Sequence, residues 1–205
     1  MPTALPKPST NGRGFAKGGF RRALPLLLAG CALVSGGALT AQALYIPVKA
    51  EIAQVMLNRA FAASVESGQP VKPWSWADTA PMARVRIERL GVSEVVLSGG
   101  SGEAMAFGPT ALVDNTARGV TVLAAHRDTH FEFVRDLNTG DILWLDRLNG
   151  SQSQYRITRL ETVRWDAFRY PLDGGGGILA LTTCYPFGSD QPGPLRRIAW
   201  AVRIT

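Results

Sequence analysis

The feature that most constrains this chain is an uncharged run of 26 residues, 23–48, which lies between Arg22 and Lys49. About 20 consecutive apolar residues are enough for a helix to cross the hydrocarbon core of a bilayer. The run therefore predicts a single transmembrane anchor near the start of the chain. A folded domain must then be built from the residues that follow it.

The distribution of charge predicts how this anchor is oriented. The 205 residues carry a formal net charge of +6, and residues 1–22 contain five basic residues and no acidic one. Residues 82–205 are almost neutral, with 14 arginines and 13 acidic residues. Because basic flanks stay in the cytoplasm, we expect a cytoplasmic tail at 1–22 and a single-pass inner (cell) membrane protein whose domain is periplasmic or extracytoplasmic. A nearly neutral domain also lacks the basic surface that a nucleic-acid partner requires.

The first segment has two other interpretations. A cleaved signal peptide also begins with a basic region, and Leu28-Ala-Gly-Cys31 matches the cleavage box of bacterial lipoproteins. A lipoprotein usually continues with a polar stretch, whereas this chain stays apolar as far as Ile46. An uncleaved anchor is therefore favoured, and lipidation of Cys31 is the alternative.

A helix and a linker are predicted between the anchor and the domain. In residues 49–65, apolar residues recur at helical spacing and predict a juxtamembrane helix, which either is a spacer or docks on the domain or on lipid. Its predicted face comprises Ile52, Val55, Met56, Arg59 and Ala60. Residues 66–81 contain three prolines and no periodicity, which predicts a linker. Trp74 and Trp76 are candidates for pinning this linker to the domain surface.

The domain at residues 82–205 is expected to be mostly β. Short segments of apolar and β-branched residues, several of them alternating with polar ones, are separated by glycine-containing turns. These segments are 83–90, 92–97, 120–125, 142–146, 154–163, 178–183 and 196–204, with a short helix or turn at 131–138. Seven or eight strands in about 120 residues, with little helix, predict a closed or nearly closed β-barrel.

Two of the predicted strands end at residues that can carry out nucleophilic chemistry. Cys184 follows strand 178–183 and His126 follows strand 120–125, so both side chains could reach one rim of a barrel. A thiolate attacks a carbonyl carbon, and a nearby imidazole can stabilise it and then protonate a leaving amine. By position alone, however, a free cysteine is most often a small buried apolar residue. A disulfide with Cys31, in the membrane segment, is not expected.

Other polar residues narrow the candidate chemistry. Arg196 and Arg197 begin the last predicted strand, where a guanidinium could hold a peptide carbonyl or a developing oxyanion. A zinc site formed by His126 and His130 is not expected, because no Cys-x-x-Cys motif and no acidic third ligand accompany them. A base, a thiol and a guanidinium together form the candidate site.

These motifs resemble those of the sortase family, which are membrane-anchored cysteine transpeptidases with an eight-stranded β-barrel. The segment Ala180-Leu-Thr-Thr-Cys184 is similar to the family's Thr-Leu-x-Thr-Cys motif. The segment Val122-Leu-Ala-Ala-His126 is similar to its Ala-Gly-His motif, and the later Phe131 and Gly140-Asp141 also match the pattern. The resemblance covers residues 82–205 and the layout with one N-terminal anchor.

The resemblance implies a role for each candidate residue. Cys184 would be the nucleophile, His126 the acid or base, and an arginine of the last strand the ligand of the substrate carbonyl or oxyanion. The family's Arg-x-aliphatic pattern, together with strand alternation, favours Arg196 over Arg197. Thr183 is expected to help line the substrate groove. No cofactor or metal is implied.

The resemblance also implies a substrate and a reaction. The substrate would be a secreted or membrane protein whose C-terminal sorting signal is similar to Leu-Pro-x-Thr-Gly. Cys184 would form a thioester with the threonine carbonyl, and an amine acceptor of unknown identity, or water, would release it. An anchor in the same lipid bilayer as the substrate would raise its effective concentration. The segments Tyr185-Pro-Phe187 and Gly193-Pro-Leu-Arg196 look most like class D and E-like sortases of the Gram-negative, marine proteobacterial branch.

Two departures from the family pattern and two alternative functions accompany this interpretation. Ala180 replaces the first threonine of the cysteine motif and Ala125 replaces the glycine before the histidine, although neither position carries reacting atoms. A cysteine protease of another fold that only hydrolyses would use the same residue types, but its cysteine usually begins a helix. The non-enzymatic alternative is an anchored β-barrel assembly module in which Cys184 belongs to the core.

Overall fold

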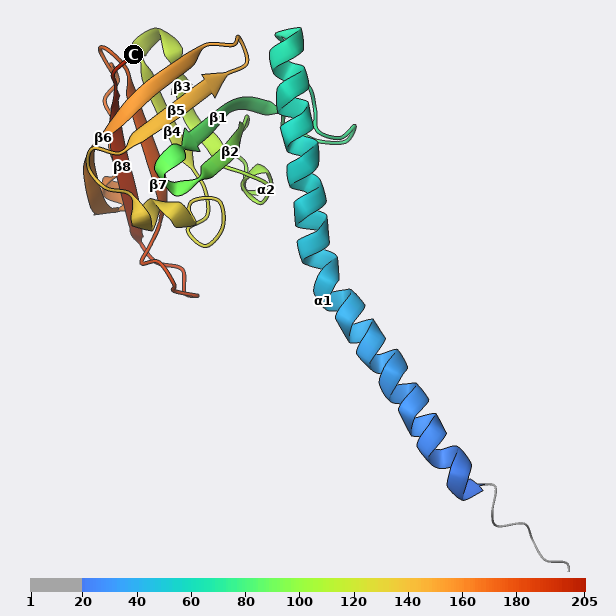
Figure 1. Cartoon of the computed structure of the whole chain (residues 1–205). Helices are drawn as coiled ribbons and strands as arrows, with labels where there is room; N and C mark the ends of the chain where they lie inside the picture. The colour runs from blue at the N-terminus through green and yellow to red at the C-terminus, as the bar shows by residue number, and fades with distance from the viewer. Residues whose placement is uncertain (1–19) are drawn as a thin grey trace, which may run out of the picture. The chain divides into compact units, whose positions relative to one another are not determined.

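The computed structural model describes residues 20–205, and the chain divides into two compact units, Met1–Val48 and Lys49–Thr205 (Figure 1). Residues 1–19 of the predicted tail 1–22 lie outside the described residues. One long helix is followed by eight strands with short helical turns between them. The strands all belong to the second unit.

Helix α1 (Phe20–Ser67) includes the whole uncharged run. Among the described residues, Leu27–Ser67 is the segment whose length and mean hydropathy of 1.6 would allow it to cross a membrane. The sequence predicted two helices separated near Pro47, but Pro25 and Pro47 both lie inside one helix. A proline removes a backbone donor, and long apolar helices tolerate this loss.

The second unit contains a closed β-barrel, as the sequence predicted. The strands follow the order β1-β2-β3-β4-β7-β8-β6-β5 around the barrel. β2 pairs with β3, and β4 with β7, in parallel, whereas the other neighbours are antiparallel. The mostly β, eight-stranded architecture with short helices is therefore confirmed. The strands are β1 (Pro81–Ile87), β2 (Val92–Leu97), β3 (Thr110–Asn115), β4 (Val120–Ala124), β5 (Ile142–Arg147), β6 (Gln152–Arg164), β7 (Ile178–Tyr185) and β8 (Leu195–Arg203).

Short helical elements connect several of these strands. They are η1 (Glu88–Leu90), α2 (Gly102–Met105), η2 (Thr116–Arg118), η3 (Glu132–Asp136) and η4 (Trp165–Ala167). The element η3 falls within the short helix or turn expected at 131–138. It follows directly on the turn that carries His126 and therefore helps to position that residue.

The wall of the barrel has two apolar sides, and these determine where functional side chains can point. Leu179 and Leu181 of β7 belong to a core cluster drawn from strands all around the barrel, which is its interior. Ala180 belongs to a second cluster with Val122 of β4 and Trp200 of β8, on the outer side. Because successive side chains of a strand alternate between sides, even-numbered residues of β7 face outward.

The part of α1 in the second unit packs against the barrel through a face that only partly matches the predicted one. Leu57 and Phe61, one turn apart, are buried in an apolar cluster with Leu97 of β2. Ile52 and Val55, from the predicted face, are 54% and 50% exposed. Of the predicted face, Ala60 is buried and Met56 is half-buried, so that prediction is only partly correct. The spacing of apolar residues along the helix does not show which of them meet the domain.

The linker between α1 and β1 is pinned by one of its two tryptophans. The Trp74 ring packs edge-on against Phe107, with ring centroids 5.1 Å apart. Trp76 is 83% exposed, so the expectation that it too pins the linker is wrong. The Thr79 hydroxyl donates to the Ser98 carbonyl at 2.7 Å and fixes the end of the linker before β1.

The pair Gly140-Asp141 fixes the start of β5. Asp141 accepts hydrogen bonds from Arg89 Nη2 at 2.6 Å and from the amide of Asn138 at 2.7 Å. The hydrogen bond from Arg89 is the main reason that the pKa of Asp141 lies below the ordinary carboxyl value, and the Asn138 amide acts in the same direction. The contacts of Asp141 therefore give it a structural role.

Candidate functional site

The candidate site is built on the parallel pairing of β4 with β7. The ladder ends with Ala124 opposite Thr182, which lies 58 positions later in the chain. The amide of Ala125 extends the contact by donating to the Thr182 carbonyl at 3.4 Å. Two residues beyond the end of this ladder, the same offset would place His126 opposite Cys184.

Glycines fix this register at the other end of the same two strands. The amide of Gly174 donates to the Arg118 carbonyl at 2.7 Å, and the amide of Ile178 donates to the Gly119 carbonyl at 2.7 Å. A Cβ atom at Gly174 would collide with the backbone of Gly119, so this close approach requires glycine. The glycine run before β7 therefore helps to set the pairing on which the site depends.

Strand β8 adds the third predicted residue. β7 and β8 run side by side (Figure 1), and Cys184 lies opposite Arg196 in their antiparallel ladder. Partners in register share one side of a sheet. Cys184 and Arg196 are thus register partners on one side of the sheet, whereas Arg197 lies opposite Thr183 on the other side. His126 lies two residues beyond the end of β4, the neighbour of β7 on its other edge.

Cys184 lies on the outer side of the barrel. It is in alternation with Ala180 of the outer apolar cluster, and its free thiol side chain is half-buried. β7 extends to Tyr185, so the cysteine lies within the end of the strand rather than after it as expected. Arg196 is also half-buried, and His126 is exposed. All three residues are therefore accessible from the outer surface.

Thr183 has a different environment from its neighbour. It is 2% exposed, and its hydroxyl donates to the carbonyl of Ala125 at 2.7 Å. Strand alternation directs its side chain away from the side that carries Cys184. These contacts support a role in joining the cysteine strand to the histidine segment rather than the expected contact with substrate.

The turn that follows His126 is anchored in the core. The amide of Phe131 donates to the His126 carbonyl at 3.0 Å, and the Phe131 side chain is fully buried. His130 Nδ1 lies 2.9 Å from Glu94 Oε2 on β2, so this second histidine is engaged by a different strand. Across residues 20–205, no group of three or more His, Cys, Asp or Glu side chains is arranged as a metal site.

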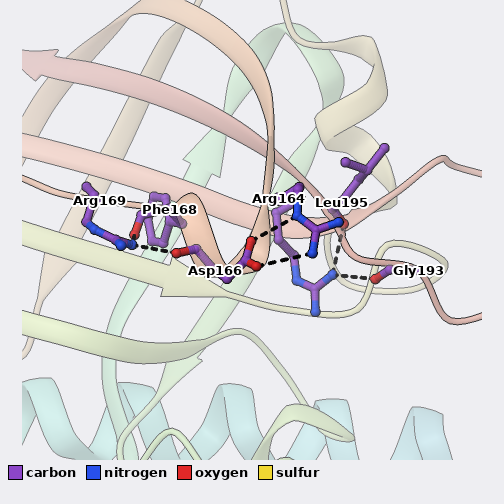
Figure 2. Close-up of polar contacts among 7 residues, drawn as sticks. Arg164, Asp166, Phe168, Arg169, Gly193 and Leu195 are labelled. Atoms are coloured by element: carbon purple, nitrogen blue, oxygen red, sulfur yellow. Dashed lines mark hydrogen bonds and ion pairs between the residues drawn. The ribbon is translucent and has the colours of Figure 1, made fainter.

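Arg196 is held by the loop that precedes it. Its Nη1 donates to the carbonyls of Gly193 at 2.9 Å and Leu195 at 2.8 Å, two residues that Figure 2 labels. An open hollow of about 330 Å³ lies beside it, lined by Trp165, Pro192, Gly193, Pro194 and Arg196. A guanidinium that borders such a hollow has further N–H groups with which to bind a carbonyl oxygen.

The loop between β6 and β7 borders the same region. Arg164 and Asp166 form a two-pronged ion pair, and Arg169 donates to the carbonyls of Asp166 and Phe168 (Figure 2). The hydrogen bond from Arg164 lowers the pKa of Asp166. The Phe168 ring lies 6.0 Å from the Trp200 ring and covers part of the outer apolar cluster. The buried members of this cluster are therefore covered by the chain itself.

One polar residue of this region was not identified from the sequence. Arg127 follows His126 and is 9% exposed, and its Nη2 atom donates to the carbonyls of Ser189 and Gln191 in the β7–β8 loop. Arginine beside the end of a strand is usually solvated. Its position in the sequence therefore gave no sign of this burial.

The arrangement can support acyl transfer through a cysteine. With the Cys184 thiol at the end of β7, its register partner Arg196 on β8 and His126 just past the end of β4, a carbonyl carbon near the sulfur could find an oxyanion ligand and a proton donor. None of these functions needs a metal or an organic cofactor. The same groups could serve hydrolysis or transfer to an amine.

Comparison with known proteins identifies a family. The model of the sortase domain matches residues 85–204, which is more than half of the chain. Sortase D of Bacillus subtilis (strain 168) is 36% identical over 88 residues, which cover 42% of this chain and 44% of that protein. The matched region therefore spans less than half the length of that relative.

Solved structures share the fold. Sortase A from Corynebacterium diphtheriae is similar with a TM-score of 0.56 and 18% identity, over 63% of this chain and 63% of that chain. Sortase C-1 from Actinomyces oris gives a TM-score of 0.52 and 21% identity, over 61% of this chain and 73% of that chain. At this level of identity the likeness concerns the architecture of the barrel.

Proposed function

The chain belongs to the sortase family, and from this premise we propose that it is a cysteine transpeptidase with Cys184 as nucleophile. The single observation that carries the proposal is the register of β4, β7 and β8, which pairs Cys184 with Arg196 and ends β4 at Ala124 opposite Thr182, two residues before His126. The substrate is a protein with a C-terminal sorting signal similar to Leu-Pro-x-Thr-Gly. The open hollow beside Arg196, which is lined by Trp165 and by residues 192–194, supports recognition of a partly apolar peptide.

In the first half of the reaction, the thiolate of Cys184 attacks the threonine carbonyl of the signal. Arg196 stabilises the oxyanion that forms, because a guanidinium keeps its charge while it donates hydrogen bonds. The C–N bond to glycine then breaks, and His126 gives its proton to the departing amine. A thioester between the threonine and Cys184 remains.

In the second half, an amine attacks the thioester carbonyl and the C–S bond breaks. His126 accepts the proton of the attacking amine, and Cys184 leaves with the electron pair as a thiolate. Water in place of the amine would give a free carboxylate. The chemical nature of the acceptor therefore decides between transfer and hydrolysis.

The proposal includes a single-pass anchor in the inner (cell) membrane. The apolar span Leu27–Ser67 and the basic residues before it support an orientation with the N-terminus in the cytoplasm and the barrel outside. Enzyme and substrate would then be held in one bilayer, which raises their effective concentration. The match to a sortase D supports the class D or E-like assignment within the family, and we propose the marine proteobacterial branch on the sequence motifs alone.

Product analysis tests the proposed reaction. The full chain in detergent is incubated with a synthetic peptide that contains Leu-Pro-Glu-Thr-Gly and with triglycine as acceptor, and the products are identified by mass spectrometry. We expect a ligated product that ends in triglycine and is absent with Cys184→Ala. Cleavage that yields only the free threonine carboxylate at every triglycine concentration would favour the hydrolytic alternative instead.

A further inference from the structure

Arg127 is a buried charged side chain to which the proposed reaction assigns no role. It directly follows His126, yet it is 9% exposed whereas His126 is exposed. Burial of a guanidinium is unfavourable unless its N–H groups find acceptors. The acceptors that it finds are two backbone carbonyl oxygens from another part of the chain, Ser189 and Gln191.

Both acceptors belong to the β7–β8 loop, residues 186–194, which begins directly after β7 and leads to Arg196. The second half of this loop is held by the Trp165 amide, which donates to Pro194 at 2.7 Å, and by Arg196, which donates to Gly193. The middle of the loop, at Ser189 and Gln191, is held by Arg127. Among the hydrogen bonds of residues 20–205, those of Arg127 are the ones that join this loop to the segment carrying His126.

The geometry of Arg127 shows that the loop carbonyls, rather than a complete pocket, determine where its guanidinium lies. Nη2 donates to both carbonyls, the one on Gln191 at 2.9 Å, whereas Nη1 is buried without a hydrogen-bond partner. A buried donor without an acceptor is unfavourable. The guanidinium is therefore placed by its contact with the loop, and the loop in turn depends on it.

We propose that Arg127 is a positioning residue that fastens the β7–β8 loop beside the acyl-enzyme, so that the thioester on Cys184 reacts with an amine rather than with water. This inference rests on the proposed function. The thioester carbonyl would be attached to Cys184, two residues before the loop begins, so a fastened loop would limit the approach of water from that side. Excluding water and fixing the acceptor's approach both favour aminolysis.

Loss of the contact between Arg127 and the β7–β8 loop should change how the acyl-enzyme is divided between aminolysis and hydrolysis. In aminolysis the C–S bond breaks, a C–N bond forms and Cys184 is released as a thiolate, with one proton passing from the amine to His126. In hydrolysis a C–O bond forms in place of the C–N bond, with the same release of Cys184. The ratio of the two products reports how well the loop excludes water, independently of how fast the thioester forms.

The test compares Arg127→Met with the wild-type chain and with Arg203→Met. Arg203 is an exposed arginine at the far end of β8 that also donates to a backbone carbonyl, that of Thr205 at 3.0 Å, so it is a matched control. The full chain in detergent is given the Leu-Pro-Glu-Thr-Gly peptide and hydroxylamine. In Arg127→Met we expect the ratio of carboxylate to hydroxamate to rise roughly ten-fold, since two charge-assisted hydrogen bonds are lost. The ratio in Arg203→Met should stay within about two-fold of wild type.

Hydrogen exchange provides a second readout that needs no substrate. In Arg127→Met, amides of the β7–β8 loop should exchange faster while those of β4 and β7 stay as protected as in wild type. An unchanged product ratio, or unchanged exchange in the loop, would overturn the role of Arg127. If Arg127→Met does not fold, Arg127→Lys takes its place, because it keeps the charge but is shorter and lacks the fork. A wild-type chain that forms no thioester would instead refute the proposed function, and hydrogen exchange would still decide whether Arg127 fastens the loop.

Discussion

At the scale of single residues, the side of β8 that an arginine occupies determines whether it can reach the reacting carbonyl. Arg196 is the register partner of Cys184, and Arg197 is the partner of Thr183 on the opposite side. The two arginines are adjacent in sequence and carry the same charge. If only one of them affects catalysis, the cause would therefore be the side of the strand on which it lies, not its positive charge.

Substitution of each arginine by methionine tests this difference. We expect Arg196→Met to lower kcat/KM by about 10²–10³-fold, because one oxyanion ligand is lost. Arg197→Met should lower it by less than about three-fold, since its hydrogen-bond partner is the hydroxyl of Thr162, at 3.4 Å. Steady-state kinetics on the peptide substrate gives both values. Equal losses, or a larger loss for Arg197→Met, would mean that the register does not select the catalytic arginine.

Thr183 offers a test of how the strands support the site. Thr183→Val removes the hydrogen bond to Ala125 and should lower the free energy of unfolding by about 1 kcal/mol. It should also lower kcat, because His126 is positioned through Ala125. Thr79→Val is the matched control, since Thr79 makes a 2.7 Å bond of the same kind to Ser98, outside the site. We expect both variants to lose a similar amount of stability, and only Thr183→Val to show a lower kcat. If Thr183→Val instead raised KM and left kcat unchanged, direct contact of Thr183 with the substrate would be favoured.

At the scale of elements, α1 and the start of β5 support the barrel from outside the site. Leu57 of α1 is fully buried, so Leu57→Ala should lower the free energy of unfolding by about 2–5 kcal/mol. Ile52→Ala, on the exposed side of the same helix, should change it by less than about 0.5 kcal/mol. Denaturant unfolding of the full chain in detergent measures both. If Ile52→Ala lowered the free energy of unfolding more than Leu57→Ala does, the side of α1 that carries Ile52 would be the one that packs on the barrel.

The start of β5 gives a dependence of stability on pH. The folded-state pKa of Asp141 is lowered by the hydrogen bond from Arg89, so its ionised form favours the folded state. This stability is fully present above the ordinary carboxyl pKa of 3.8 and is lost as the pH falls through the lowered folded value. The unfolding temperature of Asp141→Asn should therefore lie below that of wild type at pH 7, and the gap should shrink at acidic pH. A gap that does not depend on pH would show that the ionisation of Asp141 contributes nothing.

Much of this architecture follows from sequence patterns, and the exceptions have physical reasons. Seven strands were predicted by alternation or by short apolar runs, but β3 was not, because its central Leu112 is 48% exposed and its apolar residues show no regular face. Alternation also favoured Arg196 over Arg197. The docking face of α1 and the burial of Arg127 were not predictable, since both depend on which distant backbone or side chain meets them after folding.

At the scale of the whole molecule, the chain combines an apolar helix with a barrel whose chemistry lies at the ends of parallel strands. Parallel pairing of β4 with β7 brings the ends of two strands, 58 residues apart in sequence, to one edge. The family assignment and this pairing support the same nucleophile. The proposed reaction requires Cys184 to form a thioester with a sorting signal.

Trapping of the acyl-enzyme tests directly whether this thioester forms on Cys184. The full chain in detergent is mixed with the Leu-Pro-Glu-Thr-Gly peptide, quenched with acid before an acceptor is added, and digested for mass spectrometry. We expect an adduct of the peptide, without its glycine, on the fragment that contains Cys184, and we expect hydroxylamine to remove it. Cleavage of the peptide without such an adduct, or cleavage that persists in Cys184→Ala, would contradict the role of Cys184.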